Sequence, residues 1–177
     1  MRLYPIEVRF RRFGDIHLSD LIGAIGVYVI WSSRSVARPT YIGHGTILEK
    51  VSRHQKRISL RFPIPWDGYI AIFSGSTHSV LKREAMAAER LLLFFAIHHD
   101  FFPAANRNLG CSDAVADFCR HRKLRFRVTG YDPLQPPSEA RRLALPKIAD
   151  ATWQSGRRIG IYNHNWRLRK LRRPRRN

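Results

Sequence analysis

The residues whose types and spacing most clearly suggest chemistry lie between positions 47 and 61. Lys50 and His54 are four residues apart, and Arg53, Arg57 and Arg61 lie on the same flank of a predicted helix. This spacing turns a cation and an imidazole toward one side, as joint action on a single phosphate group requires. An imidazole titrates near neutral pH, so His54 can serve as a base or as a phosphate ligand.

The charge of the whole chain points to the same kind of partner. Its 177 residues include 32 Lys and Arg against 13 Asp and Glu, a formal net charge of +19. Such an excess repels itself unless a polyanion is close, so DNA, RNA or an anionic membrane surface is the expected partner. Charge alone leaves open a ribosome-associated or merely soluble basic protein.

Several features indicate an intracellular setting. No apolar run approaches the ~20 residues of a membrane span. The longest, residues 91–97, is flanked by charge and histidines and predicts a buried helix segment. The first residues lack the apolar core of a signal peptide, and Cys111 and Cys119 make neither a disulfide framework nor a paired zinc knuckle. We therefore expect a cytoplasmic protein with no membrane partner.

Strands and helices around the basic flank must position it. β-Branched and aromatic residues predict strands over 26–31, 40–43 and 66–73. The first two are expected to be antiparallel, because their connection is too short for a helical crossover. Residues 47–60 and 79–98 are typical of helices, and Ile47, Val51 and Ile58 form an apolar stripe on the first. One face of that helix should pack on the sheet, leaving the other face basic.

The remaining segments divide the chain. Residues 8–11 and 124–128 alternate like strands, whereas 112–121 and 138–154 favour helices. We expect an N-terminal lead-in at 1–23, a compact domain at 24–121 and a C-terminal extension at 122–166. A tail at 167–177, with seven basic residues and no acid, follows the extension. Such a tail is either a solvated charge run or an arm that grips phosphate.

Five short signals occur in a telling order. They are Gly26-Val27-Tyr28, then Tyr41-Ile42-Gly43 after twelve residues, a glycine-opened helix with Lys50 and His54, Glu89 in the next helix, and Pro103 with Asn106. In this order they resemble the GIY-YIG nuclease superfamily, and the resemblance covers residues 24–110. Another Gly-Ile-Tyr, at 160–162, has no matching partner after it, and we interpret it as coincidence.

The resemblance implies a fold and a site for the domain at 24–121. The fold would be α+β, a small central antiparallel sheet of three strands flanked by helices. Glu89 would bind a divalent ion, Mg²⁺ or Mn²⁺. Tyr28 and Tyr41 would line the site, with Tyr28 positioning or deprotonating a water molecule and Tyr41 orienting the water or the phosphate. A single carboxylate suits Mg²⁺, which keeps most of its waters and also takes phosphate oxygens. Glu84, on the same predicted helix, is the alternative ligand.

One position departs from the family pattern. The arginine expected four residues before the histidine is Lys50, which keeps the charge but loses the bidentate fork. Arg53, about one helical turn further on, is the alternative donor, and we expect one of the two to lower the pKa of the Tyr28 phenol and to stabilise charge on phosphorus. If neither does so, the site is degenerate and the protein only binds.

The predicted function is that of a stand-alone, metal-dependent endonuclease, a phosphodiester hydrolase acting on nucleic acid, with DNA preferred over RNA. One alternative is a catalytically degenerate nucleic-acid-binding module of the same fold. Another is a basic structural protein with a chance match, which predicts no cleft containing Tyr28, Tyr41 and Glu89. Further nucleic-acid contacts are expected from Arg57, Arg61, Asn106, Arg167, Arg169, Lys170, Arg172 and Arg173.

Overall fold

The computed structural model describes residues 3–32, 38–61, 66–98, 103, 106, 120–154 and 158–166. In chain order the strands and helices are β1 (Leu3–Arg12), β2 (Ile25–Ser32), β3 (Tyr41–Thr46), α1 (Ile47–Arg61), β4 (Trp66–Ile72), α2 (His78–His98), β5 (Lys123–Gly130), β6 (Lys147–Gln154) and β7 (Arg158–His164). Short 3₁₀ turns occupy Phe13–Asp15, Leu18–Leu21 and Pro137–Glu139. This is the predicted α+β class.

The sheet is larger than predicted. Within the described residues its strand order is β3-β2-β4-β1-β5-β6-β7. The expected antiparallel three-stranded unit exists as β3-β2-β4, but it is only one part of the sheet. Strand β1 runs parallel to β5 from Leu3 to Phe10 and then meets β4 antiparallel at Arg11 and Arg12. The alternation of β1 revealed a strand, but alternation does not say which partner that strand takes.

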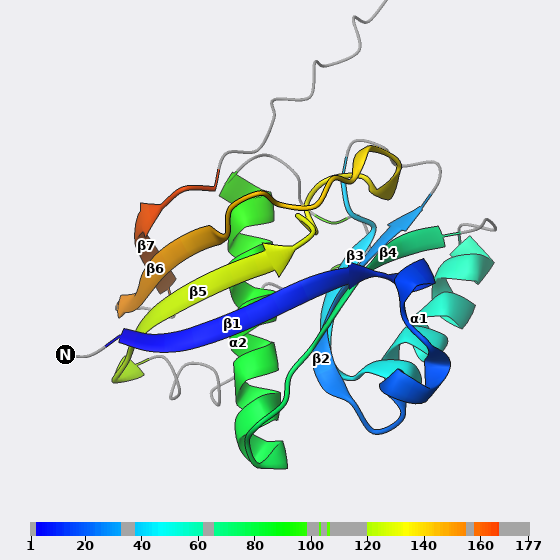
Figure 1. Ribbon diagram of the computed structural model, residues 1–177, viewed down its shortest axis with the longest axis horizontal. Coiled ribbons are helices and arrows are strands. Elements are labelled where there is room, and N and C mark those ends of the chain that lie inside the picture. The colour runs from blue at the N-terminus through cyan, green and yellow to red at the C-terminus, as the bar shows by residue number, and fades with distance from the viewer. Residues whose placement is uncertain are drawn as a thin grey trace, which may run out of the picture.

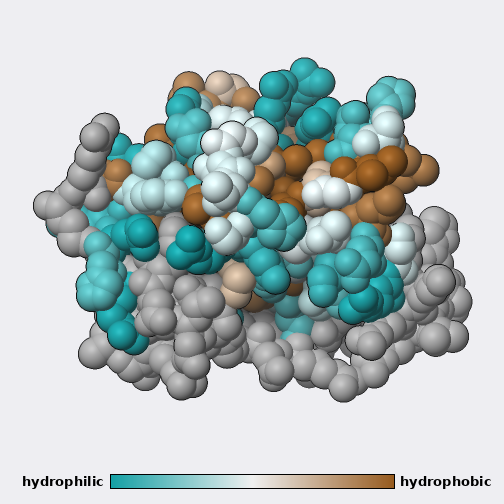
Figure 2. All heavy atoms as spheres, turned by 90° about the horizontal axis from the view of Figure 1, so that it is seen from below, coloured by the Kyte–Doolittle hydropathy of each residue, from teal (hydrophilic) through white to brown (hydrophobic). Residues whose placement is uncertain are grey.

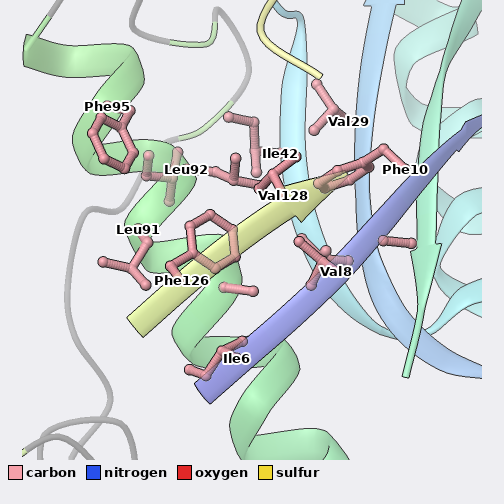
Figure 3. Packing of buried hydrophobic residues seen from close by; sticks show 14 of the residues in the cluster. Ile6, Val8, Phe10, Val29, Ile42, Leu91, Leu92, Phe95, Phe126 and Val128 are labelled. Carbon is pink, nitrogen blue, oxygen red and sulfur yellow. The ribbon is translucent and has the colours of Figure 1, made fainter. Parts of the chain in front are cut away.

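Helix α2 covers one face of this sheet. In Figure 1, β1 and β5 cross in front of α2, which lies behind them. Inward residues of the two strands, such as Phe10 and Phe126, pack with Leu91 and Leu92 of the helix (Figure 3). Burying one such side chain stabilises the fold by about 1.5–3 kcal/mol. The apolar run at 91–97 therefore serves the core, and no helix among the described residues is long and apolar enough to cross a membrane.

Helix α1 packs against the other face. A second, smaller cluster joins Ile47 and Val51 of α1 to Tyr28 and Ile30 of β2 and to Ile70 of β4. Strand β2 is consequently buried along its whole length, on both faces. A strand covered on both faces has no reason to alternate, which explains its nearly continuous apolar sequence.

The C-terminal part was predicted less well than the N-terminal part. The helices expected over 138–154 are wrong: the segment contains the Pro137–Glu139 turn and strand β6. Most of the helix predicted at 112–121 lies outside the described residues. The region 122–166, predicted as an extension, supplies β5, β6 and β7 to the same sheet as β1. Its Trp166 is buried in the main core cluster.

Candidate functional site

A cavity of about 380 Å³ lies where edge strand β3 meets the first turns of α1 and α2. Each of these elements, together with β2, contributes to its wall. The lining residues are Ile25 and Tyr28 of β2, Tyr41, His44, Gly45 and Thr46 of β3, Glu49, Lys50 and His54 of α1, and His78, Lys82 and Glu89 of α2. Figure 2 views the molecule from the end at which α2 begins, where hydrophilic side chains surround a hydrophobic area.

The cavity joins the two faces of the sheet around its edge. Tyr28 pairs with Gly43, and the neighbouring Val27 pairs with His44. Because successive strand residues point to opposite faces, His44 lies on the face covered by α2, and Tyr28 lies on the face covered by α1. Only at an edge strand can groups from both faces line one cavity, and β3 is that edge.

Gly43 leaves the space that the side chains of Tyr28 and Tyr41 occupy in the cavity wall. A Cβ atom at this position would lie 2.5 Å from the Tyr28 hydroxyl oxygen and 2.6 Å from Cε1 of Tyr41. The two tyrosine rings stack with centroids 6.0 Å apart, and Tyr41 lies 4.2 Å from the ring of His54. Both tyrosine side chains therefore pack directly against Gly43, where any side chain would collide with them.

The Tyr28 hydroxyl is strongly biased toward its neutral form. Burial raises its pKa far above the ordinary value, and the nearby Tyr41 and Glu89 raise it further. Arg53 opposes the shift but does not reverse it. The lowering expected from a basic residue is therefore present, from Arg53, but burial outweighs it and the net shift is upward. At neutral pH Tyr28 is a hydroxyl that can donate a hydrogen bond.

Lys50, and not Arg53, is the basic α1 residue that lines the cavity. Gly45, at φ +126°, leaves room for the Lys50 stem, whose Cγ and Cε would be 3.3 Å from an added Cβ. Arg53 is half-exposed and donates to the Glu49 carboxylate at 2.5 Å. The geometry therefore favours Lys50 over Arg53 as the cation that acts in the cavity.

Glu89 is one of two acidic residues that line the cavity, and it has a close neighbour. Its carboxylate contacts Nδ1 of His44, and the side chains of Glu89 and His44 are only 18% and 26% exposed. The alternative ligand Glu84 accepts a hydrogen bond from the Tyr4 hydroxyl at 2.5 Å and does not line the cavity. The other lining carboxylate, Glu49, is engaged by Arg53.

The predicted site residues fall into three groups. Tyr28, Tyr41, Lys50, His54 and Glu89 line the one cavity, whereas Arg53 does not. Asn106 is buried, and its amide donates to the Ile42 carbonyl at 2.8 Å and accepts from the Ile42 amide at 2.9 Å. Its geometry is that of a support for β3 and not of a nucleic-acid contact. The side chains of Arg57 and Arg61, and all of Arg167, Arg169, Lys170, Arg172 and Arg173, lie outside the described part of the chain.

Sequence reasoning missed four ionisable residues that line the cavity. His44 directly follows the Tyr41-Ile42-Gly43 tripeptide, so its place beside the motif was the signal. Glu49 lies in the predicted helix, where nothing in the local pattern distinguished it. His78 and Lys82 are one helical turn apart, and Glu89 follows two turns later on the same face of α2. That spacing was a readable signal.

The donor atoms suit a divalent ion. Among the described residues no group of three or more His, Cys, Asp and Glu side chains forms a metal cage. The cavity instead offers the Glu89 carboxylate with the His44 imidazole beside it, in a space large enough for several waters or a phosphate. Few protein ligands and several waters are typical of Mg²⁺-like binding.

Comparison with known proteins gives no relative. No family model matches the sequence, and no curated protein or solved structure is significantly similar to the chain.

Proposed function

We propose that this chain is a divalent-metal-dependent endonuclease that hydrolyses phosphodiester bonds of nucleic acid, with DNA as the preferred substrate. One observation carries the proposal. Tyr28, Tyr41, Lys50, His54 and Glu89 were selected by their order in the sequence, and all of them line a single cavity. A chance match to the GIY-YIG pattern gives no reason for residues from β2, β3, α1 and α2 to converge.

Each side chain has a role that its position supports. Glu89 holds the divalent ion, with Mg²⁺ or Mn²⁺ as candidates. When bound, that ion neutralises phosphate charge and activates water. Lys50, held along Gly45, supplies a cation to the charge that develops on phosphorus. The neutral Tyr28 hydroxyl donates a hydrogen bond to a phosphate oxygen or to the attacking water.

His54 is placed to share the work of the tyrosines. Its ring lies 4.2 Å from Tyr41 and 6.1 Å from Tyr28, between centroids, so the three rings form one aromatic wall. An imidazole in this wall can accept the proton of the attacking water, a task for which the raised pKa of Tyr28 makes the phenol poorly suited. We therefore assign the base role to His54 and the orienting role to the tyrosines.

The surrounding charge supports a polyanionic substrate. Lys82 of α2 and Lys50 of α1 both line the cavity, so a phosphodiester chain that enters it meets a cation from each helix. The net charge of +19 adds a long-range attraction for nucleic acid. Both features serve substrate capture, whereas Glu89 and the aromatic wall serve the chemistry.

The direct test is cleavage of supercoiled plasmid. The full chain is incubated with Mg²⁺, with Mn²⁺ or with EDTA, and single-stranded DNA and RNA are tested in parallel. We expect nicking that requires the metal and that falls by more than about 100-fold in Glu89→Gln, beyond the loss usual for a group that only supports a ligand. Glu84→Gln, five residues earlier on α2 and outside the cavity, is the matched control and should cut like the wild type. Equal loss in both variants, or no cutting of any substrate, would contradict the proposal.

A second candidate is a degenerate nuclease fold that only binds nucleic acid. Lysine at the family's arginine position favours it, because a point charge replaces a planar fork. Restored cutting by Lys50→Arg in an otherwise inactive chain would establish this alternative. Binding in EDTA without cutting by either protein would leave the binding module as the function.

A further inference from the structure

His44 stands beside the residue proposed to hold the metal, and the family resemblance gave it no role. Its Nδ1 atom contacts Oε2 of Glu89, and both side chains are largely but not fully buried in the cavity wall. The two atoms come from β3 and α2, elements that are distant in sequence. The inference below rests on the proposed role of Glu89.

The imidazole is fixed on a rigid support. His44 is paired with Val27 in the β2–β3 ladder, so its backbone is held from the inner side of the edge strand. Two residues earlier, Ile42 is held on its outer side by two hydrogen bonds with the Asn106 side-chain amide, which donates to the Ile42 carbonyl and accepts from the Ile42 N–H. A donor atom on a strand supported on both sides needs little reorganisation to bind an ion.

The local sequence leaves His44 as the large side chain of this end of β3. Gly43 precedes it and makes room for the tyrosines, while Gly45 follows it and makes room for Lys50. The tyrosines thus pack against β3 at Gly43 and Lys50 packs against it at Gly45. The His44 imidazole lies between these two glycines and faces α2. From that position the Nδ1 atom meets the carboxylate of Glu89.

We propose that His44 Nδ1 and Glu89 Oε2 are joint ligands of the divalent ion, so that the site favours Mn²⁺ over Mg²⁺. Imidazole nitrogen is a ligand that transition metals accept readily, whereas Mg²⁺ prefers oxygen and strict octahedral geometry. In the ion-free protein a hydrogen bond joins the two atoms. On binding, the ion takes the place of this hydrogen bond, and the imidazole coordinates through Nδ1 as the tautomer that carries its proton at Nε2.

The test measures metal alone, with the full chain and no nucleic acid. Mn²⁺ is titrated and its free concentration followed by electron paramagnetic resonance, and Mg²⁺ affinity is obtained by competition. In His44→Ala we expect Mn²⁺ affinity to fall by about tenfold or more and Mg²⁺ affinity by much less, so that selectivity for Mn²⁺ collapses. Glu89→Gln should weaken both ions, and His17→Ala, an exposed histidine outside the cavity, should change neither.

A second measurement needs no variant and so does not depend on His44→Ala folding. Pulsed electron paramagnetic resonance of Mn²⁺ bound to wild type should show the ¹⁴N coupling of a directly bound imidazole. Absence of that coupling, or equal loss of Mn²⁺ and Mg²⁺ affinity in His44→Ala, would overturn the proposal and make His44 a positioning residue for Glu89. Because no substrate is present, nitrogen-coordinated Mn²⁺ in a protein that never cuts would refute the nuclease and keep this inference.

Discussion

Two carboxylates at opposite ends of the sheet are treated very differently. Asp150 on β6 is buried and receives a bidentate pair of hydrogen bonds from Arg125 on the adjacent β5, at 2.8 and 2.9 Å. Glu89 faces a cavity, and its contact is with a histidine that can itself bind a metal. The hydrogen-bonding capacity of Asp150 is used by Arg125, its partner across the two strands, whereas the Glu89 carboxylate lines a cavity.

The difference separates a carboxylate that stabilises the sheet from one that is available to a ligand. On β5 and β6, the buried Asp150 carboxylate is paired with Arg125 of the facing strand, which is how a buried charge is made tolerable. At the β3 end, acidic, aromatic and basic groups converge on a cavity, an arrangement typical of a binding or catalytic site. Four substitutions test this contrast.

Gly43→Ala should be the most damaging change. Its Cβ would overlap the Tyr28 hydroxyl and the Tyr41 ring, and neither ring has a free direction in which to move within the stacked wall. We expect plasmid cleavage to become undetectable and the free energy of unfolding to fall by about 1–3 kcal/mol. Gly14→Ala is the matched control, because a Cβ there meets nothing within 4 Å. An active Gly43→Ala protein would show that the tyrosines are not part of the site.

Lys50→Ala should come next. Removing a cation that acts on the developing charge should lower the cleavage rate by about 100- to 1,000-fold, while Lys50→Arg should preserve or raise it. Arg53→Ala is the comparison, since Arg53 is half-exposed, bound to Glu49 and outside the cavity. We expect it to lose only a few-fold. The reverse ranking in single-turnover rates would assign the family's arginine role to Arg53.

Arg125→Ala tests the other end of the sheet. It removes the bidentate pair on Asp150, whose side chain is 4% exposed, and should lower the free energy of unfolding by about 1–3 kcal/mol without changing cleavage. Arg127→Ala is the control on the same strand, because its 3.4 Å contact is with the exposed Glu7 and should contribute less than about 1 kcal/mol. Urea unfolding measures both. A loss of activity in Arg125→Ala would mean that the two ends are coupled.

Much of the N-terminal fold was readable because its signals are local. The strand and helix containing Tyr28 and Lys50 follow from side-chain type and period, and the short link between β2 and β3 forces them to be antiparallel. The parallel pairing of β1 with β5 joins Ile6 to Phe126, far apart in sequence. Nothing local to either strand encodes that partner, and the three-stranded sheet expected from the resemblance did not include it. Strand β6 was missed because Ala149 and Ala151 are good helix formers, and tertiary pairing overrode their propensity.

The sequence predicted which residues line the cavity better than it predicted their pKa values. Order along the chain selected Tyr28, Lys50 and Glu89, which line one cavity, but no pattern encodes the burial that raises the pKa of Tyr28. His44 was missed because its meeting with Glu89 depends on how β3 and α2 pack. Contacts between residues of elements that are distant in sequence, such as β3 and α2, cannot be predicted from the local sequence pattern.

Asp132 gives the smallest and subtlest test of the contrast. This carboxylate lies just after β5, is buried, accepts a hydrogen bond from the Leu134 amide at 3.1 Å and lies 3.8 Å from the Lys147 ammonium. Burial raises its pKa above the ordinary value, against the smaller lowering effects of Leu134 and Lys147.

Because the pKa of Asp132 is raised, the folded state binds this proton more tightly than the unfolded state does. The stability that the proton contributes is complete below the unfolded pKa and is lost as pH rises through the folded pKa. Asn cannot titrate, so the free energy of unfolding of wild type relative to Asp132→Asn should fall as pH rises from about 4 toward neutrality, by about 1 kcal/mol or less. Urea midpoints of the two proteins at several pH values measure the slope. Parallel curves would show that Asp132 stays ionised in the fold, as satisfied by its neighbours as Asp150 is by Arg125.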